Sequence, residues 1–506
     1  MAELNDSQFR RNSYFAMVLD PTAFPLAGRD PQKHRLQVAV DSGRPELIAV
    51  LGRRRVGKTH LVRTFFEKEL CFELTGSRDG TLQEQLVNFA NSLGSLTGYR
   101  HARPESWQMA FEELIRALEP MLSKGGRRVL FFDELPWLAG RNSRFLPAFE
   151  HFWNHWASRQ KRLIVVVCGS AASWMITKFL RHKGGLHNRV TRRILLEPFT
   201  LSETEQFLET RKINWDRPQI VEFQMAMGGI PFYLNLIERG DSPAQSIQKL
   251  LFAKGAPLAN EFEELYASLF EHHERHLAVI HALAQKQQGL SRNEIQALSG
   301  IPGGGNLTTI LEELETSGFI LKTVPFGRTQ RDRLYRLVDE FSLFYLKWYN
   351  NKSQRKGSWL SRRNSPAYQA WSGYAFENLC LRHLWQLKAA LGISGVETEA
   401  SAWRYQPKSP DEKGAQIDLL IDRKDGIVNL CEMKYTDVPF TIEKSYAENL
   451  RGKRETFRQV TKIRKSLLLT MVTPCGLKPN THAHLADSQI TMDALFVPLP
   501  PEEDAG

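Results

Sequence analysis

The chain has 506 residues, of which 42% are hydrophobic, and a formal net charge of +11. This length exceeds what one hydrophobic core supports and predicts about three domains, and the ordinary apolar share excludes an intrinsically disordered chain. The surplus of cations favours a polyanionic partner such as DNA, the alternative being a charged surface that serves solubility alone.

Cysteine usage and hydropathy predict a cytoplasmic protein. The five cysteines are scattered without a CxxC spacing, which predicts neither a disulfide framework nor a zinc site. Residues 1–20 lack the uninterrupted apolar core of a signal peptide. No apolar run approaches the roughly 20 residues that span a bilayer, so we expect no membrane association.

Residues 1–200 are predicted to form an α/β core with a parallel sheet. Short apolar runs at Leu47–Leu51, Val129–Phe132 and Leu163–Cys168 alternate with amphipathic stretches. Uninterrupted runs of this kind are typical of buried parallel strands covered by helices on both faces.

A phosphate-binding loop follows the first of these runs. The pattern GxxxxGK[ST] is matched at every fixed position by Gly52, Arg53, Arg54, Arg55, Val56, Gly57, Lys58 and Thr59. Backbone N–H groups of such a loop cradle phosphate oxygens at the start of a helix, which here also contains His60. Lys58 is expected to reach the β and γ phosphates and the Thr59 hydroxyl to complete the shell of Mg²⁺. The segment Gly52–His60 therefore predicts a site for ATP and Mg²⁺.

Two acids end the second apolar run and support this site. Asp133 and Glu134 follow four apolar residues, so Asp133 is expected to order the Mg²⁺ and Glu134 to polarise the attacking water. The alternative is a buried strand followed by two solvated acids. Ser170 ends the third run and would lie near the γ phosphate as a polar sensor, or in an ordinary strand-to-loop turn.

Residues 201–260 read as a helical lid that begins with a capping pair, Ser202 and Glu205. The phosphate loop, the LFFDE run, the CGS strand end, the NRVTRRILLEPFTLSE segment and the GGIP motif together resemble the archaeal-type AAA+-related ATPases of the STAND/MNS grouping. The resemblance covers the first half of the chain. It implies that an arginine before the PF-x-x-x-E segment contacts phosphate, often in a neighbouring subunit of a homo-oligomer. Arg189 fits that place best, with Arg192 and Arg193 as alternatives.

Residues 261–349 are predicted to form a winged helix. A helix is followed by a Gly/Pro break, a second helix at Asn306–Ser317, and a hairpin whose strands flank the basic loop Phe326–Arg333. The second helix offers Asn306, Thr308 and Thr309 to DNA but also carries acids, so a protein-contact module is the alternative. The basic segment 350–367 fits a linker or a phosphate contact equally well.

Residues 368–499 are predicted to form an α/β domain. A helix at Tyr374–Leu391 is expected first, and strands are expected at Ile417–Ile421, Ile427–Cys431 and Ser466–Val472. The basic stretch Arg451–Lys465 fits either a contact with a nucleic-acid backbone or the solvated face of a helix.

Four residues of this last domain form a candidate metal site. Alternate residues of a strand face one side, so Glu432 and Lys434 are expected to point together, and Asp418 and Glu432 to share a divalent metal. Glu377 would complete the shell, and Lys434 would orient a water. The order helix-Glu, strand-Asp, strand-ExK resembles the PD-(D/E)XK nuclease superfamily. The alternative is a nuclease-like domain retained as a scaffold.

The leading hypothesis from these observations is an ATP-dependent DNA-processing enzyme with an ATPase, a DNA-binding winged helix and a nuclease domain. A regulatory or loader-like ATPase that binds DNA without cutting it is the first alternative. A signalling switch whose C-terminal domain meets a protein is the second.

Overall fold

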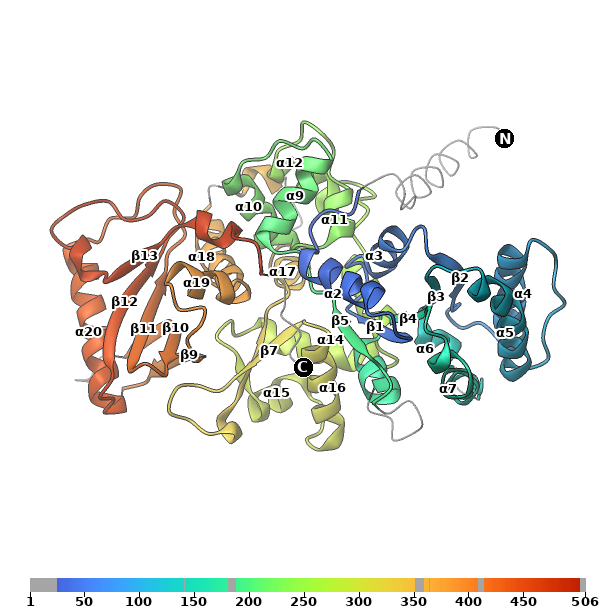
Figure 1. The fold of residues 1–506 in the computed structure, drawn as a ribbon. Helices are drawn as coiled ribbons and strands as arrows, with labels where there is room; N and C mark the ends of the chain where they lie inside the picture. Colours follow the sequence, from blue (N-terminus) through green and yellow to red (C-terminus); the bar gives the residue numbers. More distant parts are fainter. Residues whose placement is uncertain are drawn as a thin grey trace.

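The computed structural model describes residues 25–140, 142–180, 188–350, 359–363, 365–407 and 414–500. Figure 1 shows three regions in a row: the N-terminal sheet domain, a middle region of helices with a small sheet, and a C-terminal sheet domain. The predictions made for residues 1–24 lie outside the described residues. Within the described ranges, no helix is long and apolar enough to cross a membrane.

The N-terminal domain contains the predicted parallel sheet. Its strands are β1 (Glu46–Leu51), β2 (Leu70–Thr75), β3 (Arg128–Asp133), β4 (Leu163–Gly169) and β5 (Arg192–Leu195). They run parallel in the order β2-β3-β4-β1-β5. β1 is buried at all six positions, and alternate residues enter two different hydrophobic cores, one on each face. The predicted α/β fold with a parallel central sheet is confirmed.

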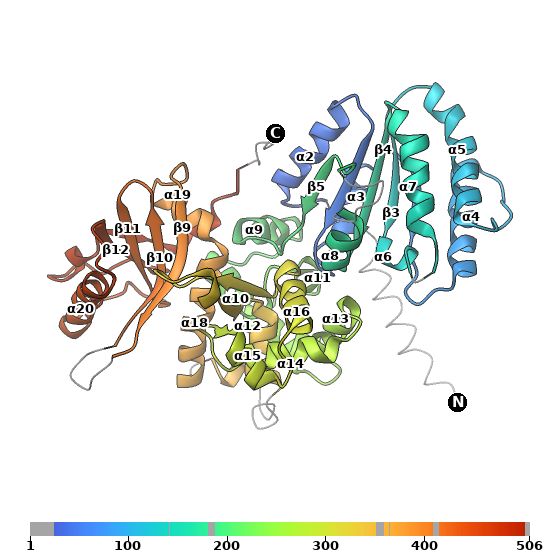
Figure 2. The same ribbon diagram turned by 90° about the horizontal axis from the view of Figure 1, so that it is seen from below.

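Helices cover both faces of this sheet (Figure 2). They are α2 (Asp30–Asp41), α3 (Lys58–Phe65), α4 (Leu82–Thr97), α5 (Trp107–Ser123), α6 (Leu135–Leu138), α7 (Phe145–His155) and α8 (Ala172–Trp174). One face packs on a separate core that contains many aromatic side chains of α4, α5 and α7. The other core, which includes residues of α2 and α3, continues through the rest of the chain. The nucleotide-site edge of the sheet is therefore joined to the following regions by continuous apolar packing.

The predicted lid, residues 201–260, is helical. It consists of α9 (Leu201–Thr210), α10 (Arg217–Met227), α11 (Pro231–Asn235) and α12 (Pro243–Ile247). The predicted cap at Ser202 and Glu205 is wrong: Thr200 caps α9 and forms the capping box with Glu203, because the helix begins one residue before Ser202. Gly229 packs so closely that an added Cβ would lie 2.0 Å from the Phe199 carbonyl oxygen, which only glycine tolerates.

The middle region follows the lid. Its helices are α13 (Glu261–Leu269), α14 (His273–Ala284), α15 (Arg292–Ser299), α16 (Gly305–Thr316) and α17 (Glu340–Phe344). Its strands are β6 (Leu290–Ser291), β7 (Ile320–Thr323) and β8 (Leu334–Leu337), in the antiparallel order β6-β8-β7. The expected second helix and hairpin are thus present as elements, and β6 is a third strand that the sequence pattern did not indicate. The interpretation as a winged helix stays a prediction.

The predicted linker is only partly described, since residues 351–358 and 364 lie outside the described ranges. Trp359 is fully buried and stacks on Phe252 with the ring centroids 5.7 Å apart. Arg363 forms a 2.6 Å ion pair with Glu222 of the lid. The end of this segment is therefore anchored to the lid.

The C-terminal domain is a mixed sheet flanked by helices. Its strands are β9 (Thr398–Tyr405), β10 (Ala415–Arg423), β11 (Ile427–Met433), β12 (Ser466–Val472) and β13 (Ser488–Ile490), in the order β13-β12-β11-β10-β9. β9, β10 and β11 are antiparallel neighbours, whereas β12 and β13 run parallel to β11. The helix α20 (Lys444–Thr461) makes the crossover between β11 and β12.

The helix expected at Tyr374–Leu391 starts earlier and is broken. α18 (Pro366–Arg382) and α19 (Leu384–Ala390) meet at His383, whose φ of −107° and ψ of 31° are not helical. The buried His383 ring accepts a 3.1 Å hydrogen bond from the backbone N–H of Leu201, so the break joins this domain to α9 of the lid. Burial lowers the pKa of His383 to about 4, which keeps the imidazole neutral.

The shorter 3-10 and π-helical turns are η2 (Ala157–Arg159), η3 (Met175–Leu180), η4 (Gln248–Phe252), η5 (Gln330–Asp332), η6 (Tyr345–Tyr349), η7 (Trp359–Ser361), η8 (Ala483–Leu485) and η9 (Met492–Phe496).

Candidate functional site

The phosphate loop lies between the carboxyl end of β1 and the start of α3. Gly52 has a φ of 147°, and an added Cβ would lie 2.4 Å from the Leu196 carbonyl oxygen, so only glycine fits there. Gly57 has a φ of 90° and is the residue before the first turn of α3. The two fixed glycines of the motif therefore serve the backbone turn that aims N–H groups at a phosphate.

Lys58 is buried across the mouth of this loop. Its ammonium group donates 2.9 Å hydrogen bonds to the carbonyl oxygens of Gly52 and Arg53, and a 3.2 Å bond to the hydroxyl of Ser170. Only 5% of the residue is exposed. A phosphate entering the loop would meet this ammonium directly, which is the role predicted for Lys58.

Thr59 and Asp133 meet beneath the loop. The Thr59 hydroxyl donates a 2.7 Å hydrogen bond to the Asp133 carboxylate, although β4 separates β1 from β3 in the sheet. The other Asp133 oxygen accepts from the backbone N–H of Glu134 at 2.9 Å and from the Cys168 thiol at 2.6 Å. A hydroxyl and a carboxylate together fit the hard-oxygen shell that Mg²⁺ prefers.

Glu134 and Ser170 form the third part of the network. Glu134 adopts a left-handed conformation with a φ of 48°, and its carboxylate accepts from the Ser170 backbone N–H at 3.0 Å and from the Ser170 hydroxyl. Such a conformation is costly for a non-glycine residue, and strained residues of this kind recur at functional sites. Ser170 thus joins Glu134 to Lys58.

Two of the three loop arginines do not point toward a phosphate. Arg53 forms a 2.5 Å ion pair with Asp339, and their side chains are 3% and 0% exposed. Arg55 forms a 2.8 Å ion pair with Glu261, which also accepts from the Tyr233 hydroxyl at 2.9 Å. The prediction that Arg53 and Arg55 belong to the nucleotide-binding set therefore holds at most for their backbone N–H groups, because their side chains are committed to carboxylates of the middle region.

The ion pair with Arg53 sets the pKa of the buried Asp339 carboxylate. Burial alone would raise the pKa of Asp339, but the Arg53 guanidinium and hydrogen bonds from Ser342 offset it, and the pKa falls below its ordinary value.

Arg54 is half-buried between the two paired arginines. His60 is half-buried on α3, where its ring lies 3.3 Å from the Thr64 hydroxyl, and burial lowers its pKa.

A further loop contact comes from Arg29, which the sequence patterns did not single out. Its guanidinium donates a 3.0 Å hydrogen bond to the Val56 carbonyl oxygen and lies 4.4 Å from the centre of the Phe199 ring. Arg29 is 3% exposed. No motif spacing identifies it, because it precedes the first strand and reaches the loop only in the folded domain.

Arg189 lies near the amino ends of the parallel strands, opposite the ends that the phosphate loop follows. It precedes β5, which runs parallel to β1, whereas the phosphate loop follows β1. Arg189 is exposed, and Arg192 lies 3.7 Å from Glu46, the first residue of β1. Neither arginine is therefore placed to reach a nucleotide on its own loop, so the predicted phosphate contact requires a second subunit.

The candidate metal ligands come from three elements of the C-terminal domain. We call Glu377 of α18, Asp418 of β10 and Glu432 of β11 the C-terminal carboxylates. Asp418 falls where the β9–β10 register shifts between Ile417 and Leu420. Such irregularities re-aim side chains, and the Asp418 carboxylate accepts a 3.2 Å hydrogen bond from the backbone N–H of Met433.

The C-terminal carboxylates affect one another electrostatically. Burial and the Asp418 charge raise the pKa of Glu377 to about 7, against the opposing charges of Arg336 and Lys434. Burial and Asp418 also raise the pKa of Glu432. Buried acids that raise one another's pKa values occur often at functional sites.

A lysine donates hydrogen bonds to both carboxylate oxygens of Glu432. The Lys453 ammonium, from α20, donates hydrogen bonds of 2.7 and 2.8 Å to this carboxylate, which is 1% exposed. Neither interpretation of the basic stretch, a nucleic-acid contact or a solvated face, accounts for Lys453. Within the described ranges, no three His, Cys, Asp or Glu side chains gather closely enough to hold a metal ion.

The hairpin loop of the middle region touches the C-terminal domain. Phe326 packs against Phe457 with the ring centroids 5.2 Å apart, and its backbone N–H donates to the Ala402 carbonyl oxygen at 3.2 Å. Lys322 is paired with Glu315 at 3.1 Å. Arg328 and Arg331 remain exposed on the loop.

Comparison with known proteins identifies the N-terminal part. Residues 29–237 match the model of an ATPase domain found predominantly in Archaea. An uncharacterized protein of Methanocaldococcus jannaschii, MJECL04, is 23% identical over 419 residues, which cover 81% of this chain and 87% of that protein.

Two solved structures are similar over about the same share of the chain. The Walker-type ATPase PABY2304 of Pyrococcus abyssi has a TM-score of 0.48 at 20% identity, covering 64% of this chain and 96% of that one. The ORC2 protein of Aeropyrum pernix has a TM-score of 0.43 at 14% identity, covering 65% and 96%. The family match and the residues of the loop together show that residues 29–237 form an archaeal-type ATPase domain with a P-loop.

Proposed function

We propose that this chain is an ATP-hydrolysing DNA-processing enzyme whose ATPase domain is coupled to a metal-dependent DNA endonuclease domain. The network of Lys58, Thr59, Asp133 and Glu134 supports ATP hydrolysis. Lys58 would neutralise the transferring phosphate, Thr59 and Asp133 would hold Mg²⁺, and Glu134 would accept a proton from the attacking water. Nucleotide hydrolysis needs each of these groups, and the loop brings them within one hydrogen-bonded network.

The observation that carries the nuclease part is the position of Asp418 beside β11, where its carboxylate accepts a 3.2 Å hydrogen bond from the backbone N–H of Met433, the residue after Glu432. All three carboxylates are partly or fully buried, and the charge of Glu432 is balanced by Lys453, which a metal would have to displace. Their donor chemistry fits Mg²⁺, which Asp418 and Glu432 would hold with Glu377 if the three carboxylates, which do not gather around one point within the described ranges, moved closer together. The bound ion would lower the pKa of a water and neutralise the scissile phosphate. Lys434, two residues after Glu432, would orient that water.

The order of elements in this domain supports the same proposal. A helix carrying Glu377 precedes three antiparallel strands, and a crossover helix leads to a parallel strand. The part of this order that puts Glu377 on a helix, Asp418 on a strand and Glu432 on the next strand is what the resemblance to PD-(D/E)XK nucleases implies.

DNA contact is proposed for the middle region. The exposed first turn of α16 offers Asn306, Thr308 and Thr309, and the hairpin loop adds Arg328 and Arg331. Because Arg189 cannot reach its own loop, we also propose a homo-oligomer in which it contacts the nucleotide of a neighbour.

A second function is favoured by one observation. Lys453 neutralises Glu432 with two short hydrogen bonds, which is what a carboxylate without a metal requires. A regulatory ATPase that binds DNA through a non-cleaving, nuclease-like domain is therefore the alternative.

The experiment that separates the two is a nuclease assay with Mg²⁺ or Mn²⁺, with and without ATP, on linear, circular and branched DNA. We expect cleavage by the natural chain, its loss in Asp418→Ala, and its retention in Glu455→Ala, a control acid exposed on α20. ATPase activity should be unchanged in both variants. If the natural chain cleaves no DNA with either metal, the regulatory ATPase replaces the nuclease.

A further inference from the structure

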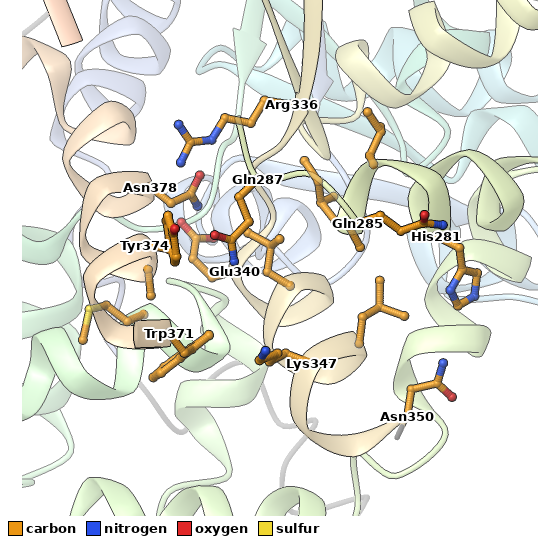
Figure 3. A pocket seen from close by; sticks show the side chains of 17 residues that line it. His281, Gln285, Gln287, Arg336, Glu340, Lys347, Asn350, Trp371, Tyr374 and Asn378 are labelled. Atoms are coloured by element: carbon orange, nitrogen blue, oxygen red, sulfur yellow. The ribbon is translucent and has the colours of Figure 1, made fainter. Parts of the chain in front are cut away.

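The strand β8 directs one arginine of the middle region, Arg336, toward the C-terminal domain. Successive side chains of a strand point to opposite faces. Tyr335 and Leu337, on either side of Arg336, are buried in the core that runs through the middle region. The Arg336 side chain therefore lies on the other face of the strand, and Figure 3 shows it extending from β8 toward α18.

A hydrogen bond holds this end of β8 against α18, the helix of Glu377. The Val338 carbonyl oxygen, two residues after Arg336, accepts a 2.8 Å hydrogen bond from the side-chain amide of Asn378. Asn378 is 1% exposed and directly follows Glu377. The contact that fixes β8 is thus one residue away from a C-terminal carboxylate.

A second contact reaches β10, the strand of Asp418. Leu290 of β6 is the register partner of Tyr335 in β8. Gln288, two residues earlier, donates a 3.2 Å hydrogen bond from its side-chain amide to the side-chain oxygen of Gln416. Gln416 lies on β10, two residues before Asp418. The sheet of the middle region is therefore held against both elements that carry Glu377 and Asp418.

The guanidinium of Arg336 has no partner of its own. It is half-buried on the wall of a cavity of about 400 Å³, and within the described ranges no hydrogen bond or ion pair joins its side chain to another residue. Burial lowers the pKa of Arg336, and the charges of Glu377 and Asp418 oppose this shift without cancelling it. Arg53 and Arg382, in contrast, are each paired with a carboxylate. A half-buried cation without a pair indicates a missing anion.

We propose that Arg336 binds a backbone phosphate of DNA beside the C-terminal carboxylates, so that the middle region supplies part of that site. The planar fork of N–H donors on a guanidinium matches the oxygens of a phosphate. The carboxylates repel a phosphate, so a cation that they do not already pair has to hold it. Lys453 is bound to Glu432, whereas Arg336 has its donors available. This inference rests on the proposed contact with DNA, and on neither the metal nor cleavage.

The hairpin loop leads from its exposed cations to this arginine. Arg331 is exposed on the loop that precedes β8. At roughly 3.4 Å per residue, the chain between Arg331 and Arg336 spans at most about 17 Å. This corresponds to about five base pairs of duplex DNA. DNA held by the loop therefore continues to Arg336 and the C-terminal carboxylates without a long detour.

DNA binding without metal tests the contact. The full chain is titrated with a short DNA duplex in a chelator, so that nothing is cleaved, at several salt concentrations. Arg336→Gln should weaken binding several-fold and reduce the salt slope by about 0.9, the value for one phosphate contact. Arg336→Lys keeps the charge without the fork, so it should keep the slope and bind more weakly than the natural chain. Arg128→Gln, which removes a half-buried arginine from β3 of the ATPase domain, is the matched control and should change neither quantity.

Thermal unfolding separates a phosphate contact from a structural role. Because the cost of burying Arg336 exceeds the attraction of the nearby acids, Arg336→Gln should leave the unfolding midpoint unchanged or raise it. An arginine that served only to neutralise Glu377 would give a lowered midpoint, which the double variant with Glu377→Gln would restore. A folded Arg336→Gln protein with the natural salt slope overturns the proposal, whatever its midpoint.

The outcomes also separate this inference from the proposed function. DNA binding whose slope does not depend on Arg336 overturns the inference alone. Binding that depends on Arg336, in a chain that cleaves no DNA with Mg²⁺ or Mn²⁺, supports the inference and leaves the regulatory ATPase as the function. A natural chain that binds no duplex DNA overturns the inference together with the proposed DNA contact.

Discussion

The nucleotide site and the C-terminal carboxylates differ in how their charges are balanced. At the nucleotide site, Lys58 donates to Ser170 and to two carbonyl oxygens of its own loop, and Asp133 accepts from Thr59. In the C-terminal domain, Glu432 is neutralised by Lys453, a cation that no candidate metal chemistry requires. On binding its ligand, the first site exchanges hydrogen bonds that Lys58 makes to its own loop and to Ser170, whereas the second must exchange an ammonium for a metal.

The two sites also differ in how they are tied to the rest of the molecule. Arg53 and Arg55 join the phosphate loop to the middle region through buried ion pairs. The C-terminal domain is joined to the lid through the neutral ring of His383 and an exposed Arg217–Asp493 ion pair, and to the middle region through Arg382 and Glu340. Side chains of the phosphate loop therefore contact α13 and the residue that caps α17 directly.

The largest expected effect is on ATP hydrolysis. Lys58→Ala should abolish turnover, because it removes the charge that neutralises the transferring phosphate, and Glu134→Gln should lower turnover by about 10²-fold or more while leaving ATP bound. Phosphate release and nucleotide binding measured on the same samples distinguish the two variants. Turnover at the natural rate in either variant would contradict the assignment of Lys58 and Glu134 to ATP hydrolysis.

The next effect is on the free energy of unfolding. Arg53→Met leaves Asp339 buried without its partner, and breaking such a pair costs about 3–5 kcal/mol. The double variant Arg53→Met with Asp339→Asn should recover part of that loss, since no charge is then left unpaired. Arg44→Met, an exposed arginine, serves as the control and should change the free energy by no more than about 0.5 kcal/mol.

Denaturant titration measures these differences. If Arg53→Met is as stable as Arg44→Met, the ion pair with Asp339 does not hold the loop to the middle region. The phosphate loop and α17 would then not be held together by this pair.

Lys453 gives a smaller effect that depends on metal. Lys453→Met leaves Glu432 unpaired, and because Lys453 is partly exposed we expect a loss of about 2 kcal/mol, below the range for fully buried pairs. Mg²⁺ or Mn²⁺ should restore this stability by about 2.7 kcal/mol at 100 times its dissociation constant. Thermal unfolding with metal and with a chelator measures the difference.

The same measurement decides between the two proposed functions. A metal that stabilises Lys453→Met more than the natural chain shows that ammonium and metal compete for Glu432. A metal that stabilises neither chain indicates a site without metal, as the regulatory alternative requires. Lys465→Met, which breaks an ion pair with Asp422 away from Glu432, is the matched control.

The sequence predicted local patterns well and long-range pairs poorly. The phosphate loop can be predicted from sequence because its fixed residue types are required by the backbone geometry, as where Gly52 closely approaches Leu196. The expected strands at Ile427–Cys431 and Ser466–Val472 became β11 and β12, since apolar runs signal burial directly. The capping pair was misplaced by two residues because Thr200 and Ser202 are chemically equivalent as caps.

The pairs that join the regions could not be predicted. Arg53 and Asp339 lie 286 residues apart, and neither residue type signals the other. Lys453 was grouped with a basic stretch because α20 looks uniformly solvated in sequence, although one of its lysines turns toward Glu432. β6, with two residues, was too short for its pattern to be distinguished from a loop.

The smallest expected effect concerns DNA binding by the hairpin loop. Each phosphate neutralised by a cation releases a counterion, so the logarithm of the binding constant falls with the logarithm of salt by about 0.9 per contact on duplex DNA. Of the loop cations, Arg328 and Arg331 are exposed, whereas Lys322 is already paired with Glu315. Arg328→Glu with Arg331→Glu should therefore flatten the slope by about two contacts, and Lys322→Glu should leave it nearly unchanged. Because Phe326 fixes the base of this loop to the C-terminal domain, DNA held by the two arginines would lie next to that domain. A slope that stays the same in the double variant would place the DNA elsewhere, and the coupling of DNA binding to the C-terminal carboxylates would lose its structural basis.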